Sequence, residues 1–207
     1  MSLEELVDNT RTDKNTTHSY LPLYQQLLES KKETAQNVLE IGISLGGSIK
    51  LWNQFFPNAT VYGVEILSKL EVCQKYLADE SQSETLWNDL ENNDKIKLLY
   101  PSNAYDADFV TTQLVAPGVK FDVILDDGTN SYEDMRRVIE LYADLLTDNG
   151  VLIIEDIQTQ AWLDDLTGVV PDHLRPFVRT HDLRPNKNRY DDMVFVIDKS
   201  SVPTESS

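Results

Sequence analysis

Short apolar runs alternate along the chain with stretches whose apolar residues recur at helical spacing. The short runs have the length and the β-branched content of buried strands, and the amphipathic stretches are typical of helices. Predicted strands cover residues 37–41, 60–64, 96–100, 121–125, 151–154 and 193–197. Predicted helices cover residues 19–31, 48–56, 107–114 and 132–146.

Polar residues between these runs predict helix ends and one surface excursion. Ser48 is placed to cap the helix that follows it, and the turn Asp148-Asn149-Gly150 is placed to close the helix that ends at residue 146. Residues 79–94 are polar and predict a surface excursion. Trp87 within it is either a local anchor or an aromatic surface for a ligand.

Strands that alternate with helices form βαβ units, which close into a parallel sheet covered on both faces. The pattern therefore predicts an α/β fold of Rossmann-like type, a doubly wound, mostly parallel sheet with helices on both faces. The 207 residues suffice for one such domain. We expect residues 1–36 to form an N-terminal helical or lid segment, 37–199 the main domain and 200–207 a flexible tail.

The net charge of the chain indicates which classes of binding partner are unfavourable. Acidic residues outnumber basic ones 35 to 18, which gives a net charge of −17. This argues against nucleic acids and anionic membrane surfaces, because both are bound through Lys and Arg. The chain lacks an apolar run of membrane-spanning length and a signal-peptide pattern at its start, so we predict a cytoplasmic protein. Cys73 is the only cysteine and lies in an apolar helical stretch, which predicts a buried thiol.

A glycine-containing loop joins the first predicted strand to the next helix and reads Glu40-Ile41-Gly42-Ile43-Ser44-Leu45-Gly46-Gly47-Ser48. Glycines allow a tight turn and a close approach of a ligand to the backbone. The spacing departs from G-x-G-x-x-G and disfavours a dinucleotide. Glu65 ends the second strand, where an acid can accept hydrogen bonds from both ribose hydroxyls. The alternative is a glycine turn that binds no ligand.

These residues resemble the S-adenosylmethionine motif of class I methyltransferases. More narrowly, the chain is similar to the metal-dependent sugar O-methyltransferases of macrolide and polyketide glycosides, the mycinamicin and tetracenomycin type. The resemblance spans nearly the whole chain and is weakest after Ala78. It rests on Val38 to Gly42, Gly46-Gly47-Ser48, Trp52, Phe56-Pro57, Tyr62 to Glu65, Thr12-Asp13-Lys14, His18, Tyr20, Tyr24, Asp126-Asp127-Gly128 and Ile154-Glu155-Asp156.

The resemblance implies S-adenosylmethionine as cofactor and assigns parts of it to residues of this chain. Glu40, Gly42 and Asp126 would face the methionine part, and Glu65 the ribose. Ser102 and Asn103 fall where such enzymes contact the adenine. The predicted cofactor-binding residues are Glu40, Gly42, Ser44, Gly46, Ser48, Glu65, Ser102, Asn103 and Asp126.

Three acids follow two strands that should be neighbours: Asp127, Glu155 and Asp156. Carboxylates that converge repel each other unless a cation lies among them, and oxygen ligands suit Mg²⁺. A sugar diol could complete the coordination shell, and the metal would orient one hydroxyl and lower its pKa. The family match strengthens this interpretation. The alternative is a solvated acidic turn.

The general base is the main departure from the family. The resembling enzymes carry a histidine three residues after the metal-binding aspartate, where this chain has Asn130. An amide cannot take up a proton at neutral pH. His18 and His181 are candidate replacements, so Asp127, Asn130, His18 and His181 form the predicted catalytic set, and the base is unassigned. His173 is a weaker candidate.

Four aromatic residues are candidates for stacking on a sugar: Tyr20, Tyr24, Trp87 and Tyr190. Tyr20 and Tyr24 are spaced to share one helix face, so packing in the core is an equally good interpretation for them.

The leading hypothesis is an O-methyltransferase that acts on a hydroxyl of a sugar or glycoside, such as a deoxysugar of the rhamnose type, with a divalent metal. Alternatives are a catechol-type methyltransferase of small molecules and a cofactor-binding protein without catalysis, which Asn130 motivates. A resemblance to the cephalosporin hydroxylase group leaves the subfamily open, and the glycine spacing disfavours an NAD-dependent oxidoreductase. The expected partner is a small-molecule or glycan acceptor, and the length is compatible with a homo-oligomer or with part of a larger enzyme.

Overall fold

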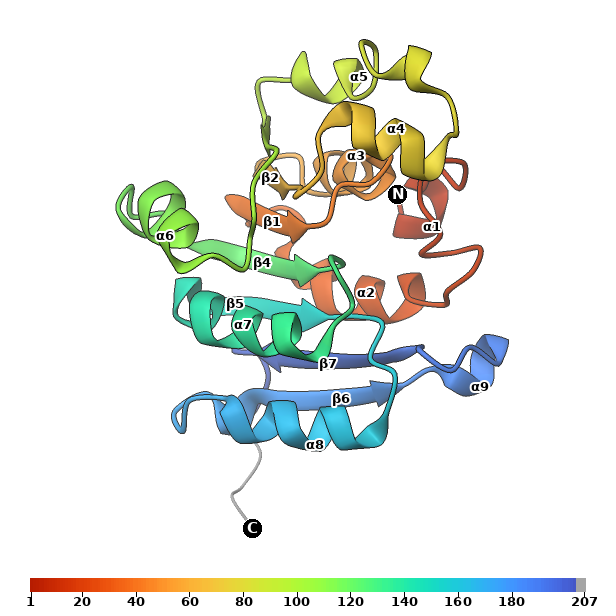
Figure 1. Ribbon diagram of the computed structural model, residues 1–207. Coiled ribbons are helices and arrows are strands. Elements are labelled where there is room, and N and C mark those ends of the chain that lie inside the picture. The colour runs from red at the N-terminus through yellow and green to blue at the C-terminus, as the bar shows by residue number, and fades with distance from the viewer. Residues whose placement is uncertain (204–207) are drawn as a thin grey trace.

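The protein is built around one seven-stranded sheet, seen in a computed structural model that describes residues 1–203 (Figure 1). The strand order is β3-β2-β1-β4-β5-β7-β6. All pairings are parallel except those of β7 with β5 and β6, which are antiparallel. The strands are β1 (Asn37–Ile41), β2 (Thr60–Val64), β3 (Ile96–Leu99), β4 (Phe121–Asp126), β5 (Leu146–Ile154), β6 (Val178–Asp182) and β7 (Met193–Asp198).

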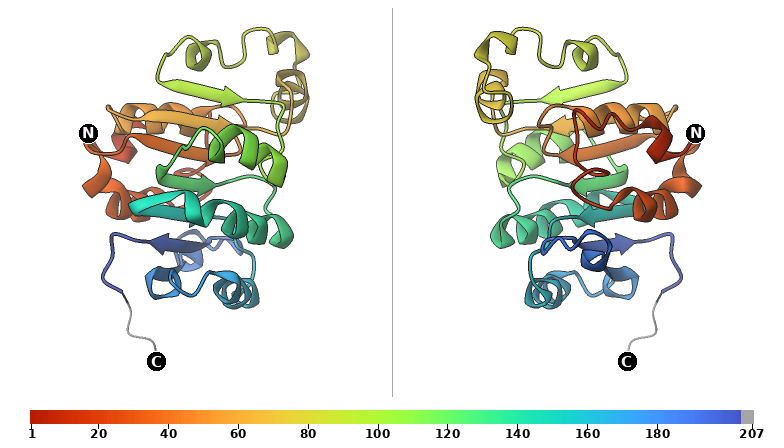
Figure 2. Two further views of the ribbon diagram at one scale, coloured as in Figure 1. Left: turned by 90° about the vertical axis from the view of Figure 1, so that its left-hand side faces the viewer. Right: turned by 90° about the vertical axis from the view of Figure 1, so that its right-hand side faces the viewer.

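Helices cover both faces of the sheet (Figures 1 and 2). The α-helices are α1 (Leu3–Leu6), α2 (Leu21–Leu28), α3 (Gly47–Phe55), α4 (Lys69–Tyr76), α5 (Asn88–Glu91), α6 (Ala107–Val110), α7 (Tyr132–Tyr142), α8 (Gln160–Val169) and α9 (Arg184–Lys187). Helical turns of other types are η1 (Glu29–Lys31), η2 (Glu80–Gln82), η3 (Thr111–Val115), η4 (Ala143–Leu145) and η5 (Arg175–Phe177). The predicted doubly wound α/β fold is confirmed.

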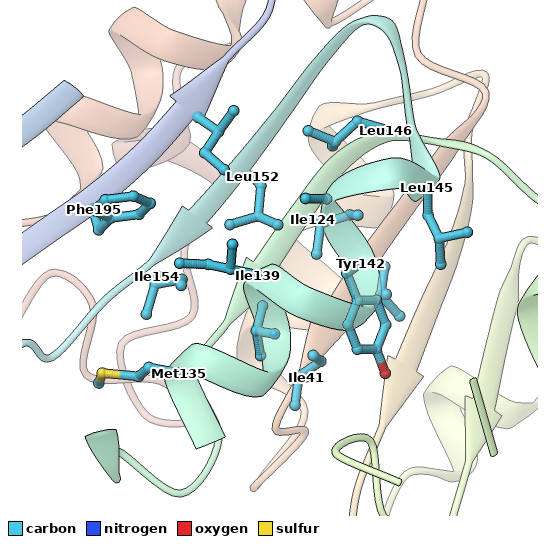
Figure 3. Close-up of a cluster of buried hydrophobic side chains, with 14 of the residues drawn as sticks. Ile41, Ile124, Met135, Ile139, Tyr142, Leu145, Leu146, Leu152, Ile154 and Phe195 are labelled. Carbon is cyan, nitrogen blue, oxygen red and sulfur yellow. The ribbon is translucent and has the colours of Figure 1, made fainter. Parts of the chain in front are cut away.

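Two hydrophobic cores fill the space between the sheet and its helices. Residues of a strand alternate between them, because successive side chains point to opposite faces: Leu39 packs in one core and Val38 in the other. The first core lies against α7 and α8, and Figure 3 shows α7 residues such as Ile139 beside Ile124 and Leu152 of the sheet. The second lies against α2 and α3. The apolar faces of the helices therefore fix them on the sheet.

The order of the strands reverses between β1 and β4. From β1 the chain builds outward through β2 to β3, and it then returns to add β4 and β5 on the other side of β1. Ligands of such sheets bind outside the carboxyl ends of the strands at this switch point. The predicted glycine loop follows β1, and the predicted metal-binding acids follow β4 and β5, so both lie at that edge.

Two predicted helix ends are wrong. Ser48 does not cap α3: the N-cap is Gly46, at φ 80°, and Ser48 lies inside the helix. A left-handed backbone favours glycine there, and the side chains of Leu90 and Trp87 pack against that position. Residues 148–150 do not form a separate turn after a helix but belong to β5, in a stretch where its register with β4 shifts.

The polar excursion at residues 79–94 contains η2 and α5 and is anchored by Trp87. That indole is 1% exposed, and its Nε1 donates to the carbonyl of Ser44 at 2.9 Å. Trp87 is therefore an anchor and offers no stacking surface for a sugar. Cys73 is buried as predicted. Within residues 1–203, no helix has both the length and the apolar character needed to span a membrane. Of the predicted tail, residues 204–207 lie outside the described residues.

Candidate active site

Three carboxylates converge where β4 and β5 end, and we call Asp127, Glu155 and Asp156 the acidic cluster. One oxygen of each lies within 4.8 Å of the others. Burial raises the pKa of Glu155 well above its usual value and that of Asp156 to about 6, and the charge of Asp127 adds to both shifts. The structure thus brings the predicted metal ligands together in a place that favours either a proton or a cation.

A lysine ammonium lies inside this cluster. Lys14 is fully buried, and its Nζ lies 2.5 Å from Asp127 Oδ2, 2.7 Å from Glu155 Oε1 and 3.5 Å from Glu40 Oε1. Burial alone would lower the pKa of Lys14, but the surrounding carboxylates outweigh it and raise that pKa well above the usual value. The sequence alone assigns no role to Lys14. In a polar N-terminal stretch, no local sequence pattern distinguishes a lysine that is buried from one that is exposed.

Side chains from other elements donate hydrogen bonds to the acidic cluster. Tyr20 Oη donates to Asp156 Oδ1 at 2.5 Å, and Tyr24 Oη donates to Glu155 Oε2. Asn130 Nδ2 donates to Asp156 Oδ2 at 2.9 Å. Burial raises the pKa of both tyrosines, so they stay protonated donors. Tyr20 and Tyr24 therefore belong to the buried support of the cluster and present no face to a ligand.

The two candidate histidines lie in different places. His18 is buried beside the acidic cluster: its Nδ1 is 2.6 Å from Asp192 Oδ1 and 3.6 Å from Asp156 Oδ1. His181 lies on the edge strand β6, which β7 separates from β5. Burial and the charge of Arg179 lower the pKa of His181. Within residues 1–203 the buried Nε2 of His181 has no hydrogen-bond partner, and His173 is exposed on the surface.

A small pocket, which we call the inner pocket, opens beside the glycine loop and has a volume of about 120 Å³. Four of the predicted cofactor-binding residues line it: Gly42, Ser44, Glu65 and Ser102. The Glu65 carboxylate accepts hydrogen bonds at 3.1 Å from the backbone N–H groups of Ile43, Ser44 and Leu67. Glu65 thereby fixes the shape of the loop and presents a carboxylate at the end of β2.

The backbone at the inner pocket leaves no room for side chains at two glycines. A Cβ on Gly42, at φ 92°, would lie 2.0 Å from the carbonyl oxygen of Asp127. A Cβ on Gly128 would lie 1.9 Å from Tyr105 Oη. The glycine loop and the loop after β4 therefore approach each other closely, and neighbouring atoms of the protein fill the space that a side chain would need at both glycines.

Other predicted cofactor-binding residues lie behind or beside this pocket. Glu40 and Asp126 are buried under it, where Glu40 accepts a hydrogen bond from Trp52 Nε1 at 3.0 Å and Asp126 from Tyr105 Oη at 3.0 Å. Burial raises the pKa of both acids to about 7. Asn103 is exposed and accepts a hydrogen bond from the backbone of Tyr105.

A larger cavity, the outer cavity, has a volume of about 500 Å³ and lies over the acidic cluster. Residues 9–13 and Thr16 of the N-terminal segment form part of its wall, with Asp127, Asn130 and Asp156 on another side. The inner pocket and the outer cavity share six lining residues: Ser44, Lys75, Tyr76, Asp127, Gly128 and Thr129. The two spaces therefore adjoin, and Asp127 lines both.

Comparison with known proteins finds relatives among the O-methyltransferases. No protein-family model matches the chain. It is 28% identical over 168 residues to demethylmacrocin O-methyltransferase of Streptomyces fradiae, covering 77% of this chain and 37% of that one. It is 26% identical over 155 residues to mycinamicin VI 2''-O-methyltransferase of Micromonospora griseorubida, covering 70% of this chain and 33% of that one. The predicted resemblance to sugar O-methyltransferases is confirmed. The chain spans about a third of the length of these curated relatives.

A solved structure supports the fold. The methyltransferase MycE of the mycinamycin biosynthetic pathway, in complex with Mg, SAH and mycinamycin VI, matches with a TM-score of 0.67 at 20% identity. The match covers 99% of this chain and 57% of MycE. At this level of identity the comparison establishes that the two chains share a fold.

The residues of this chain fit both the metal ion and the nucleoside ligand that are bound in the MycE structure. The donor set of the acidic cluster is all oxygen, which suits a hard divalent cation such as Mg²⁺. The inner pocket is lined by Gly42, Gly128 and the carboxylate of Glu65, and a carboxylate at this place suits the ribose of a nucleoside.

Proposed function

We propose that this chain is the catalytic domain of an S-adenosylmethionine-dependent O-methyltransferase that acts on a hydroxyl of a sugar in a glycoside, assisted by a divalent metal. The observation that carries the proposal is the shared wall at Asp127: the inner pocket, the outer cavity and the acidic cluster meet at this residue. A methyl donor and a hydroxyl acceptor need such adjacent sites. The named activities of the relatives support the same reaction class.

The residues of the inner pocket would hold the donor. Glu65 would accept hydrogen bonds from the ribose hydroxyls, and Gly42 and Gly128 would line the space that holds the donor. Ser102 lines the same pocket at the end of β3. When bound, S-adenosylmethionine supplies a methyl group on a sulfonium, which an oxygen nucleophile in line with it can accept.

The residues of the outer cavity would orient the acceptor. Asp127, Glu155 and Asp156 would hold a divalent cation, which supplies positive charge that favours the ionised acceptor hydroxyl. Asn130 donates to Asp156 and cannot act as a base. His18, next to Asp156 and hydrogen-bonded to Asp192, is the nearer of the two candidate histidines to the acceptor side.

The organisation of the chain is part of the proposal. We propose that residues 1–36 form the segment that covers the outer cavity and that residues 37–199 form the cofactor-binding domain. The contribution of residues 9–13 to the cavity wall supports this division. A cytoplasmic location, and assembly into a homo-oligomer or a larger enzyme, stay predictions.

The proposal is tested by calorimetric titration with S-adenosylhomocysteine, with Mg²⁺ and again with EDTA, followed by turnover assays with rhamnosides. We expect binding in the micromolar range, and we expect Asp127→Asn to keep this binding but to lose turnover by about a hundredfold or more. Asp144→Asn makes the same charge change at an exposed acid and should behave as the parent chain. A folded sample that does not bind S-adenosylhomocysteine would overturn the proposal, and binding without turnover of any acceptor would favour the non-catalytic alternative.

A further inference from the structure

The Lys14 ammonium occupies the side of the acidic cluster that a metal ion would need. Its Nζ lies between Asp127 Oδ2 and Glu155 Oε1, at 2.5 and 2.7 Å. Both residues belong to the set that could hold an ion. A divalent cation on the same two carboxylates would be in contact with a buried ammonium, and two cations at that distance repel strongly where water is excluded. Lys14 in this position therefore competes with a metal.

A second acceptor for the same ammonium lies next to the first. Glu40 Oε1 is buried, and within residues 1–203 it has no hydrogen-bond partner. It lies 3.5 Å from Lys14 Nζ, while the other oxygen of Glu40 is occupied by Trp52 Nε1. Buried polar atoms are normally paired at hydrogen-bond distance, and this oxygen has only the longer ion pair with Lys14 Nζ, so it can receive a closer donor. Only a small movement of the ammonium is required to reach it.

We propose that Lys14 is a positioning residue: its ammonium is the internal counter-cation of the acidic cluster, and it transfers from Asp127 and Glu155 to Glu40 as a divalent cation binds. The inference rests on the metal-binding part of the proposed function. Glu40 lies two residues before Gly42 of the inner pocket. The transfer therefore connects the metal ligands with the strand that leads into the cofactor loop.

The test measures Mn²⁺ binding to the chain without cofactor or acceptor, by titration calorimetry or by the electron paramagnetic resonance signal of free Mn²⁺. Because Lys14→Met removes the competing charge and keeps much of the side-chain volume, it should bind Mn²⁺ about tenfold more tightly or better. Lys14→Arg keeps the charge and should bind as weakly as the parent chain. Lys31→Met removes another buried ammonium, which donates to the carbonyl of Asn149, and it should leave the affinity unchanged.

A second variant tests the transfer itself. Glu40→Gln removes the charge that receives the ammonium, so it should weaken Mn²⁺ binding several-fold in the parent chain and leave it unchanged in the Lys14→Met background. Equal weakening in both backgrounds would mean that Glu40 acts only through its charge and would overturn the transfer. If Lys14→Met does not fold, the single Glu40→Gln variant tests the transfer. An unchanged affinity for Mn²⁺ in that variant overturns the proposal.

The outcomes separate this inference from the proposed function. Mn²⁺ binding by the parent chain, with no gain in a folded Lys14→Met variant, overturns the role of Lys14 and leaves the metal centre intact. Absence of Mn²⁺ binding in both proteins overturns the metal centre, and the inference falls with it.

Discussion

Glu155 shows how completely the N-terminal segment supports the acidic cluster. One of its oxygens accepts from Lys14 Nζ and the other from Tyr24 Oη, and the side chain is 2% exposed. A buried carboxylate is stable in the folded protein only where such donors replace its hydration. The two donors, Lys14 and Tyr24, are far from Glu155 in the sequence but adjacent to it in space.

We predict that Tyr24→Phe destabilises the protein by about 1–3 kcal/mol, since it leaves one buried oxygen of Glu155 without a donor. Urea-induced unfolding followed by circular dichroism measures this loss. Tyr190→Phe is the matched control, because that ring is 63% exposed, and it should change the free energy of unfolding by less than about 0.5 kcal/mol. Equal stabilities of the two variants would contradict the prediction.

At the residue scale, the sequence predicts the acids but not their partners. Asp127, Glu155 and Asp156 follow apolar runs, so their place at a sheet edge follows from the strand pattern alone. Lys14 has no such signal, because lysines are nearly always exposed. The pairing of His18 with Asp192 joins residues 174 positions apart, and a single sequence has no local pattern for such a contact.

The glycine loop after β1 packs closely against the loop after β4. Gly42 accounts for this approach, because both its φ of 92° and the nearby carbonyl of Asp127 exclude a side chain. The same contact fixes Asp127 relative to the inner pocket. The spacing of the two sites is thus set by backbone packing between neighbouring elements.

We predict that Gly42→Ala lowers the free energy of unfolding by about 3 kcal/mol or more, because the new Cβ would lie 2.0 Å from a carbonyl oxygen at a left-handed residue. The variant should also lose binding of S-adenosylhomocysteine in calorimetry. Gly168→Ala in α8 is the control: a Cβ there meets no atom within 4 Å, and the change should stabilise the helix by up to about 1 kcal/mol. A Gly42→Ala protein as stable as its parent would contradict this account.

At the element scale, buried strands are predictable and half-exposed ones are not. The six predicted strands are all present, because each is an apolar run. The missed strand β6 reads Val178-Arg179-Thr180-His181-Asp182 and is only partly buried, so it has no apolar run to reveal it. The sequence predicts a serine cap at Ser48, but α3 begins after Gly46, where packing against Leu90 and Trp87 requires glycine.

At the scale of the whole molecule, buried acids govern the pH dependence of stability near neutrality. Burial raises the pKa of Glu40 and of Asp126 to about 7 in the folded chain, whereas the unfolded chain has ordinary values for both acids. At pH values between the unfolded and the folded pKa of these acids, the folded chain binds more protons than the unfolded chain. The free energy of unfolding therefore falls as the pH rises through this range, and it levels off above the folded pKa.

We therefore predict that the metal-free protein is about 1–2 kcal/mol more stable at about pH 6.5 than at about pH 8. Thermal melts in matched buffers with EDTA should show a difference of a few degrees. Glu40→Gln and Asp126→Asn each remove one titrating group and should each flatten the profile. A stability that is constant or rises over this range would show that these acids are not protonated in the folded state.

The contacts of Lys14 and His18 also bear on the order in which the protein folds. Lys14 is 113 and 141 residues from its partners Asp127 and Glu155, and His18 is 174 residues from Asp192. Closing loops of this length costs entropy that early local contacts do not repay. During synthesis the N-terminal segment leaves the ribosome before any of these partners exists. We therefore expect the acidic cluster to acquire the Lys14 ammonium and its tyrosine donors late in folding, after β1, β4 and β5 have formed the sheet edge that receives them.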